Sequence, residues 1–305
     1  MDVKIGKVIK GLGGLYDVRY TDGSDVKIVS CRARKNIKRT DDKVLIGDNV
    51  ELSFDKDGTV IEKILDRKNS LIRPPIANLD YLFITFSVSN PMPVLSTIDK
   101  MTAIARHNNI TPIIIITKSD CSSEYAKYED VYLKSGFEVF VCSSENGQGI
   151  DRINNYINVH LKNGVTGAFS GASGVGKSTL MNMLFPNLNL DTGEISSKIM
   201  RGKHTTRHVE LYEIGTGKDA GFLADTPGFG FLDFEHFDFF GVEELLTSFC
   251  DLEKHSHLCR YADCTHTKEE ECGIAEAVNN GLIPSSRLES YRELYKVLKS
   301  KKNYK

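Results

Sequence analysis

The sequence predicts a multidomain α/β protein, in which a small β-barrel is followed by a doubly wound, mostly parallel sheet and then by a helical segment. Residues 1–68 alternate apolar and polar positions in short runs bounded by turn residues, as the strands of a small barrel do. Residues 69–235 alternate apolar strand-like runs with helical patterns, which is typical of a parallel sheet covered by helices. Residues 236–305 combine helical stretches with a cluster of cysteine and histidine residues. We therefore predict three domains with these boundaries.

The composition is that of a soluble globular protein with 305 residues, of which 40% are hydrophobic and 26% are charged. Lysine and arginine total 39 against 41 acidic residues, so any binding to nucleic acid would depend on local basic patches. No run approaches the ~18 apolar residues of a membrane span, and the N-terminus lacks the apolar core of a signal peptide. We expect a cytoplasmic protein without a membrane partner. Seven cysteines are too few for a disulfide scaffold.

The predicted barrel rests on five short apolar runs, at residues 16–20, 26–29, 44–46, 50–54 and 60–64. Turn signals such as Asp22-Gly23 and Asp57-Gly58 separate them. Five short strands in under seventy residues favour a barrel of the OB type. An SH3-like barrel or another small β domain is the alternative.

A basic run lies between two of these strands, with cations at Arg32, Arg34, Lys35, Lys38 and Arg39. One interpretation is a solvated loop. On an OB-type barrel, however, loops of this kind lie where oligonucleotides bind, and this favours contact with RNA.

The middle of the chain predicts strands at 82–88, 112–116, 138–141, 165–170 and 220–224, with helices at 95–107 and 150–161 between them. The run 113–116 consists of isoleucine alone, as in a parallel strand that is buried on both faces. Functional loops of such a sheet belong at the carboxyl ends of its strands.

One of these ends carries a phosphate-binding P-loop, which follows a strand and opens a helix as that motif requires. Its glycines allow backbone amides to wrap the β-phosphate, whose charge the helix N-terminus favours. Lys177 would reach the β- and γ-phosphates, and Ser178 would ligate Mg²⁺. We expect the nucleotide to contact Ser170, Gly171, Ala172, Ser173, Gly174, Val175, Gly176, Lys177, Ser178 and Thr179.

A guanine-recognition motif follows the isoleucine strand, as Thr117-Lys118-Ser119-Asp120. A carboxylate at Asp120 accepts hydrogen bonds from N1–H and N2–H₂ of guanine, whereas adenine offers no such pair of donors. The stem of Lys118 would cover the base. The usual motif begins with asparagine, so Thr117 is a departure. Ser143 and Ser144 follow the next strand and would contact the guanine O6.

The magnesium and γ-phosphate motif follows a later strand, as Asp225-Thr226-Pro227-Gly228. Asp225 would hold Mg²⁺ through water, and the amide of Gly228 would contact the γ-phosphate. Phe229 stands where Ras-like enzymes place the glutamine that orients water, so we expect slow intrinsic hydrolysis completed by another group or a partner.

Lys177 of the P-loop is one catalytic candidate. A switch loop between the P-loop and Asp225 supplies the others. Thr205 and Thr206 are both candidates for capping Mg²⁺, and the sequence does not choose between them. His204 is the local candidate for positioning water, with an ordinary polar residue of a basic loop as the equal alternative.

The C-terminal segment contains Cys259-x4-Cys264-x-His266-x5-Cys272, three thiols and one imidazole that match a tetrahedral structural zinc set. Four protein ligands leave no open position, which indicates a structural rather than a catalytic Zn²⁺. Nearby Cys250, His255 and His257 are possible substitutes. The other interpretation is three buried free cysteines beside a surface histidine.

In an ordinary GTPase the P-loop comes first and guanine recognition comes late, whereas here residues 117–120 precede the P-loop by about fifty residues. The motifs are all present in circularly permuted order, which predicts a circularly permuted P-loop GTPase domain. With the barrel, the Phe229 position and the zinc spacing, the whole chain resembles the ribosome small-subunit-dependent GTPase A family, the RsgA/YjeQ type of circularly permuted GTPase. The resemblance implies an OB fold, a permuted GTPase domain and a C-terminal helical zinc-binding domain. It also implies GTP hydrolysis stimulated by the small (30S) ribosomal subunit, contact with its rRNA and a late role in its maturation.

We accordingly expect GTP and GDP with Mg²⁺, one structural Zn²⁺, the small subunit and its rRNA as cofactors and partners, and a monomer. A GTP-regulated RNA-binding module with negligible turnover is the alternative, and an ATP-using P-loop kinase is a third interpretation that Asp120 disfavours. Since the chain runs from Gly228 soon into the zinc-binding domain, we also expect γ-phosphate sensing to pass to that domain.

Overall fold

The computed structural model describes residues 3–34, 37, 43–55, 58–72, 74–186, 209–225 and 238–302. The chain divides into two compact units, and each is described by itself. Unit 1 comprises residues 1–81, 151–170 and 177–229, and unit 2 comprises residues 82–150, 171–176 and 230–305. The predicted domain boundaries after residues 68 and 235 stay predictions.

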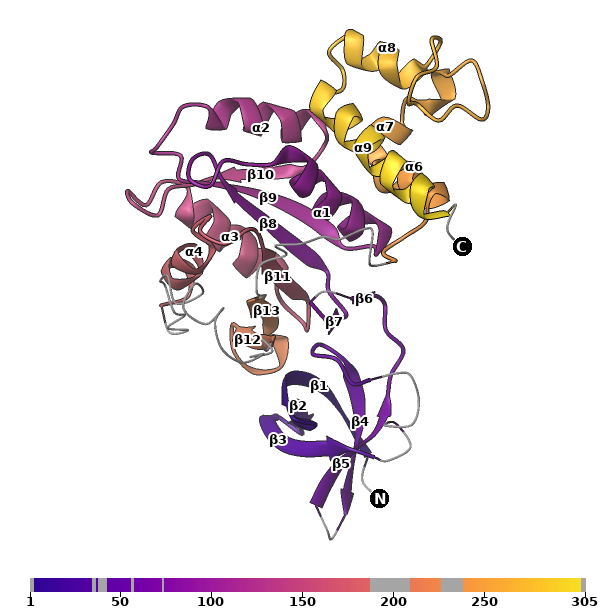
Figure 1. Ribbon diagram of the computed structural model, residues 1–305. Coiled ribbons are helices and arrows are strands. Elements are labelled where there is room, and N and C mark those ends of the chain that lie inside the picture. The colour runs from indigo at the N-terminus through magenta and orange to yellow at the C-terminus, as the bar shows by residue number, and fades with distance from the viewer. Residues whose placement is uncertain are drawn as a thin grey trace, which may run out of the picture. The chain divides into compact units, whose positions relative to one another are not determined.

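An N-terminal barrel forms the first part of unit 1 (Figure 1). Its strands are β1 (Val3–Leu12), β2 (Leu15–Asp22), β3 (Asp25–Ala33), β4 (Asn49–Asp55) and β5 (Gly58–Ile64). They close in the order β1-β2-β3-β5-β4-β1, with β3 parallel to β5 and every other pair antiparallel. This closed five-stranded arrangement confirms the OB-type barrel. The buried side chains of Val8, Val18, Val50, Leu52 and Ile61 fill its interior.

Two of the strand assignments in the barrel differ from the prediction. The run 44–46 is buried but forms no strand, and Ile46 makes an isolated bridge to Ile76. The fifth strand is instead β1, whose inward positions include Gly6 and Val8. A Cβ atom at Gly6 would lie 2.6 Å from Cγ1 of Val18, so the interior has room for glycine and no larger residue there.

The rest of unit 1 contains β11 (Thr166–Ser170), which pairs in parallel with β13 (Gly221–Asp225), and β12 (Glu210–Ile214), which pairs antiparallel with β13. The helices α3 (Ile150–His160) and α4 (Lys177–Leu184) precede and follow β11 in the chain, and residue 150 itself belongs to unit 2. Strand β12 was not predicted. The short hairpin β6 (Ser70–Leu71) and β7 (Ile76–Ala77) follows the barrel.

The barrel contacts these strands through side chains of β1 and β2. Lys10 pairs with Glu210 across β1 and β12, and Arg19 pairs with Glu213 at 3.0 Å. The Nζ atom of Lys7 lies 5.3 Å from the centre of the Phe222 ring. Burial there lowers the pKa of Lys7 to about 8, because few water molecules remain to solvate its ammonium group.

Unit 2 begins with β8 (Tyr81–Ser87), apart from its first residue, and contains β9 (Thr111–Thr117) and β10 (Glu138–Val141), which pairs in parallel with β9. Helices α1 (Leu95–His107) and α2 (Tyr125–Lys134) connect them, and α1 agrees with the predicted helix. The isoleucines at 113–116 are fully buried, as the sequence predicted for a strand covered on both faces.

The C-terminal part of unit 2 is helical, with α6 (Leu245–Ser248), α7 (Cys250–Glu253), α8 (Gly273–Asn279) and α9 (Ser285–Lys302). Helix α9 packs along α1 (Figure 1). Among the described residues, no helix is both long and apolar enough to cross a membrane.

Candidate functional site

The P-loop backbone is fixed at its first glycine by close packing. Gly171 has φ 155°, and a Cβ atom there would lie 2.1 Å from the carbonyl oxygen of Thr85, so no other residue fits without moving β8. Residues 172–174 are exposed, whereas Val175 is buried. The loop therefore packs against β8 at Gly171 and leaves residues 172–174 accessible to a ligand.

The guanine-recognition motif contacts the P-loop directly. The hydroxyl group of Thr117 donates to the backbone oxygen of Val175 at 2.6 Å, and it also lies 3.1 Å from the backbone oxygen of Phe86. The Nζ atom of Lys118 donates to the backbone oxygens of Gly174, at 2.9 Å, and of Asn90. Thr117 is buried, so it ties strand β9 to the P-loop rather than facing a base edge. The two motifs thus form one structural site.

Asp120 lies at the exposed end of this site, held by a neighbouring loop. Its Oδ1 atom accepts a hydrogen bond from the hydroxyl group of Ser143, and its Oδ2 atom lies 3.3 Å from Sγ of Cys121. The hydrogen bond from Ser143 lowers the pKa of Asp120, so the carboxylate stays ionised and able to accept hydrogen bonds. Ser143 itself is buried and accepts from the amide of Glu145.

Two other serines of this region, Ser119 and Ser144, differ in exposure, and Ser119 is the buried one. The amide of Ser119 donates to the carbonyl oxygen of Cys142 at 3.2 Å, which holds the motif against the end of β10. Ser144 is half-buried beside Ser143. The structure therefore places Asp120 beside Ser143 and Ser144, the serines that the sequence predicted for the guanine site.

The predicted phosphate and magnesium residues lie at corresponding ends of β11 and β13 in unit 1. Phe169 of β11 is in register with Asp225, the last residue of β13, so the two strands end at the same edge of their sheet. Lys177, Ser178 and Thr179 form the first turn of α4. The side chain of Asp225 lies outside what the structure describes. So do the predicted residues His204, Thr205, Thr206, Gly228 and Phe229.

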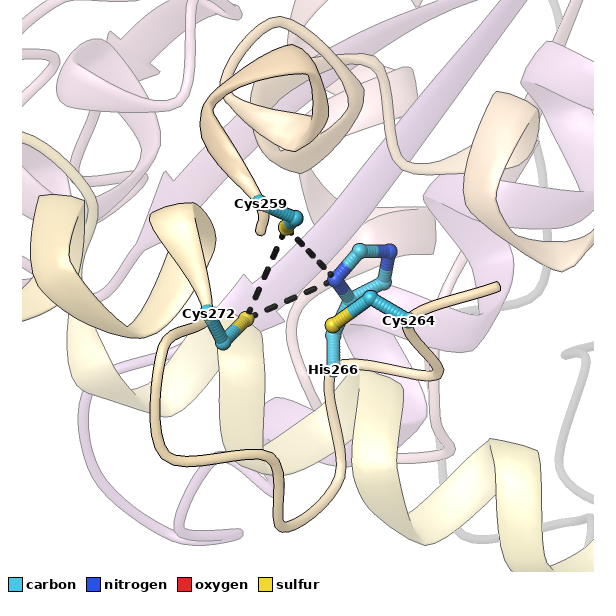
Figure 2. A group of neighbouring side chains, drawn as sticks. All are labelled: Cys259, Cys264, His266 and Cys272. Atoms are coloured by element: carbon cyan, nitrogen blue, oxygen red, sulfur yellow. Dashed lines mark hydrogen bonds between the residues drawn. The ribbon is translucent and has the colours of Figure 1, made fainter. Parts of the chain in front are cut away.

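The structure brings together the four predicted metal ligands (Figure 2). The ligand atoms of Cys259, Cys264, His266 and Cys272 all lie within 4.8 Å of one another. Nδ1 of His266 lies 3.5 Å from the Sγ atoms of both Cys259 and Cys272, which are 3.9 Å apart. Tetrahedral Zn²⁺ bonds require about 3.6 Å between nitrogen and sulfur and about 3.8 Å between two sulfurs. The separations among Cys259, His266 and Cys272 therefore match tetrahedral Zn²⁺, and Cys264 lies close enough to be the fourth ligand.

The substitutes that the sequence left open lie elsewhere. Within the described residues, Cys250, His255 and His257 belong to no group that could hold a metal ion. The structure disfavours the interpretation of three buried free cysteines beside a surface histidine, because His266 is buried and its imidazole lies among the three thiols.

Residues around the cluster fix the loop that carries it. The carboxylate of Glu269 accepts from the amide and hydroxyl groups of Thr265 with Oε1, and from the amides of Thr267 and Lys268 with Oε2. Although burial opposes ionisation, these hydrogen bonds hold the pKa of Glu269 at about 2. The guanidinium group of Arg292 on α9 donates to the backbone oxygen of His266 at 2.9 Å.

Sequence reasoning missed Glu269, Arg292 and Asn90. A motif offers no signal for Asn90, because its contact to Lys118 uses the backbone oxygen, which every residue has. Glu269 follows Thr265 by four positions and could have suggested a side-chain bond to the loop backbone.

Family models match most of the chain. The model described as RsgA GTPase matches residues 64–235, and the model described as RsgA N-terminal domain matches residues 5–61. Over 304 residues the chain is 37% identical to the small ribosomal subunit biogenesis GTPase RsgA of Alkaliphilus metalliredigens, covering 98% of this chain and 99% of that protein. Over 305 residues it is 39% identical to the protein of the same name from Bacillus velezensis, covering 97% and 98%.

Two solved structures share the fold. The crystal structure of YjeQ from Thermotoga maritima has a TM-score of 0.79 and 30% identity, covering 97% of this chain and 99% of that one. The crystal structure of YloQ, described as a circularly permuted GTPase, has a TM-score of 0.76 and 32% identity, covering 100% and 96%. The circularly permuted order predicted from the motifs therefore agrees with the description of YloQ.

Proposed function

The chain belongs to the RsgA GTPase family, and we propose that it hydrolyses GTP on the small (30S) ribosomal subunit during a late stage of that subunit's maturation. One observation above all supports the nucleotide part of this proposal. Thr117 and Lys118 bond to the P-loop carbonyls of Val175 and Gly174, so a base-reading motif and a phosphate-binding motif meet although their order is reversed.

Each nucleotide contact then has a proposed residue. Asp120 reads the guanine edge, and the backbone amides of Gly171–Gly176 bind the phosphates. Lys177 balances the charge of the β- and γ-phosphates. Ser178, Asp225 through water, and Thr205 or Thr206 as the cap would hold Mg²⁺, which would supply stabilisation of negative charge on the phosphate oxygens. His204 positions the attacking water.

The zinc cluster has a structural role in this proposal. Cys259, Cys264, His266 and Cys272 would provide the four ligands of one Zn²⁺. Their grouping within 4.8 Å, and the separations among Cys259, His266 and Cys272, support this. Zn²⁺ would join the two ends of the loop 259–272. Hydrogen bonds of Glu269 within this loop, and the bond from Arg292 of α9 to His266, already orient it.

The barrel supplies the proposed contact with rRNA. Arg32 is exposed on β3, whereas Arg34 pairs with Glu62 at 2.8 Å and so has part of its charge balanced within the barrel. Lys35, Lys38 and Arg39 of the basic run lie outside the described residues. We expect Arg32→Ala to weaken binding to small subunits at low salt and to reduce the salt dependence of binding, with Arg34→Ala as the smaller effect. Equal effects of the two would contradict this assignment.

The proposal places a monomer in the cytoplasm, with the domains 1–68, 69–235 and 236–305 as barrel, GTPase domain and zinc-binding domain. Phosphate release by the purified chain, measured with and without purified small subunits, tests it. We expect slow release alone and strong stimulation by the subunits. Stimulation by large subunits of the same strength would contradict the choice of partner, and no stimulation would favour the GTP-regulated RNA-binding module.

A further inference from the structure

Arg287 is a fully buried cation that joins three helices of unit 2. Its Nε and Nη2 atoms donate to the two carboxylate oxygens of Asp251 on α7, both at 2.8 Å. Its Nη1 atom donates to Asp99 at 2.7 Å and lies 3.2 Å from the hydroxyl oxygen of Thr102, both on α1. Because Arg287 belongs to α9, this one side chain fastens the metal-bearing C-terminal segment to helix α1.

Aromatic rings as well as carboxylates contact the guanidinium group of Arg287. Its guanidinium carbon lies 4.7 Å from the centre of the Phe249 ring and 5.3 Å from that of Phe137. Removing the arginine would leave Asp99 and Asp251 buried without their cation, which is among the costliest changes in a protein interior. Helices α1, α7 and α9 therefore have one strongly preferred arrangement.

From Arg287, packed rings lead to the metal cluster. The Phe249 ring contacts the Tyr291 ring edge-on at 5.6 Å between centres. Tyr291 in turn lies 5.9 Å from the imidazole of His266, a predicted zinc ligand. Phe249, Tyr291 and His266 are all buried. Because a close-packed interior transmits strain, a shift of the loop that carries His266 would alter the packing around Arg287.

On its other side, Arg287 leads to the nucleotide site. Phe137 packs against Tyr132 at 6.0 Å between ring centres, and Tyr132 packs against Phe86 of β8 at 5.8 Å. The backbone oxygen of Phe86 lies 3.1 Å from the hydroxyl group of Thr117, which donates to the P-loop. The series of contacts from the metal ligands to the P-loop is thus continuous and lies inside one unit.

We propose that Arg287 is a positioning residue for the guanine-nucleotide site, through which an intact metal cluster increases nucleotide affinity. Packed side chains with one preferred arrangement transmit such coupling, and the coupling is reciprocal, so bound nucleotide must tighten metal binding by the same factor. The inference uses the zinc site of the proposed function but goes beyond it, since a structural ion need not affect a distant ligand.

The test measures the dissociation constant of a fluorescent GDP analogue with the full-length chain. The metal is left in place or removed with a zinc-selective chelator while Mg²⁺ is kept in excess. We expect metal removal to weaken binding about 5- to 10-fold, within the usual range of coupling between two sites. Zinc affinity, measured by competition with a chromophoric chelator, should rise by the same factor when GDP is present.

The route is tested by Phe249→Leu, which interrupts the ring contacts and avoids exposing the buried carboxylates. In this variant we expect metal removal to change the GDP constant less than about 2-fold, with zinc still bound. Lys100→Met is the matched control, because Lys100 pairs with Glu293 at 3.0 Å and so joins the same two helices, α1 and α9, elsewhere. It should keep the full effect. Tyr291→Leu repeats the test if Phe249→Leu melts early.

Three results would overturn the inference, and each can be told apart from the other two. Bound zinc whose removal leaves the GDP constant unchanged would contradict the coupling but leave the zinc site intact. A purified chain without stoichiometric metal would contradict the zinc site as well. A full effect retained in both Phe249→Leu and Tyr291→Leu would show that the coupling, if present, does not pass through Arg287.

Discussion

The hydroxyl group of Thr117 lies 2.6 Å from the backbone oxygen of Val175, a residue 58 positions later in the chain. The first residue belongs to the guanine-recognition motif and the second to the P-loop. This hydrogen bond is buried, so it holds the two motifs together at low dielectric and without competition from water. The two motifs are therefore in direct contact, although the guanine-recognition motif comes before the P-loop in the chain.

Thr117→Val should weaken nucleotide binding about 10-fold, or about 1.4 kcal/mol, because it leaves the carbonyl of Val175 without its donor at almost constant side-chain volume. Thr117→Ser keeps the hydroxyl group and should bind within about 2-fold of the parent. Equilibrium titration with a fluorescent GDP analogue measures both. Thr111→Val, at the exposed start of the same strand, is the control. Equal affinities for Thr117→Val and the parent would show that the hydrogen bond does not shape the site.

Glu269→Gln should reduce zinc affinity about 10- to 100-fold, as is typical when the groups that orient metal ligands are changed. An amide accepts at one atom only, so the Nε2 group would face either the backbone amides of Thr267 and Lys268 or the donors of Thr265. Competition with a chromophoric chelator measures the affinity. Glu270→Gln, an exposed neighbour, should change nothing. A matching loss in both variants would assign the effect to surface charge.

Lys7 should make stability depend on pH in the alkaline range. Burial lowers its pKa from 10.5 to about 8, so between these values the unfolded chain holds a proton that the folded chain has lost. Stability then rises with pH across this window, and the depressed pKa represents a cost of up to about 3 kcal/mol at pH 7. Lys7→Met should be more stable than the parent at pH 7 and should lose this rise.

Urea unfolding at pH values from 7 to 10 measures the effect of Lys7→Met as a difference from the parent. Lys10→Met on the same strand is the matched control, since Lys10 is exposed and pairs with Glu210. It should retain the rise of the parent. A parallel pH dependence in the parent and in Lys7→Met would mean that Lys7 stays solvated in the folded protein.

Patterns of apolar residues predicted most of the α/β sheet but less of the barrel. The isoleucine strand was predictable because both of its faces are buried, which needs an unbroken apolar run. Strand β1 was not, since its inward face includes Gly6, while Val3 and Ile5 on the other face are exposed. A narrow barrel interior selects small residues at close contacts, and this removes the hydrophobic signal of the strand.

The strand predicted at residues 44–46 was wrong for the opposite reason: an apolar pattern is present, but no strand forms. The run is apolar because Val44 and Ile46 are buried, yet the amide of Leu45 bonds to the side chain of Asp48 in a turn rather than to a neighbouring strand. Burial and strand pairing have separate causes, and a three-residue run cannot distinguish them.

The candidate sites also differ in how far the sequence could predict them. The spacing of Cys259 to Cys272 was enough to predict the cluster, because ligand chemistry and loop length limit the arrangements available. The pairing of Arg287 with Asp99 was beyond reach, since these residues are 188 positions apart and charged side chains are usually exposed. The expected route from Gly228 to the zinc-binding domain lies outside the described residues. The contacts through Arg287 instead connect that domain to the guanine side of the site.

Competition for a fluorescent GDP analogue by GDP, ATP and XDP, in the parent and in Asp120→Asn, tests the central claim that residues 117–120 and 171–176 form one guanine-nucleotide site. Asparagine would donate to the O2 atom of xanthine but lose the carboxylate that accepts both guanine donors. We predict that GDP competes and ATP does not in the parent. Asp120→Asn should lose about 100-fold or more in GDP affinity and prefer XDP, whereas the control Asp130→Asn on α2 should match the parent. Equal competition by ATP and GDP in the parent, or unchanged GDP affinity in Asp120→Asn, would contradict the claim.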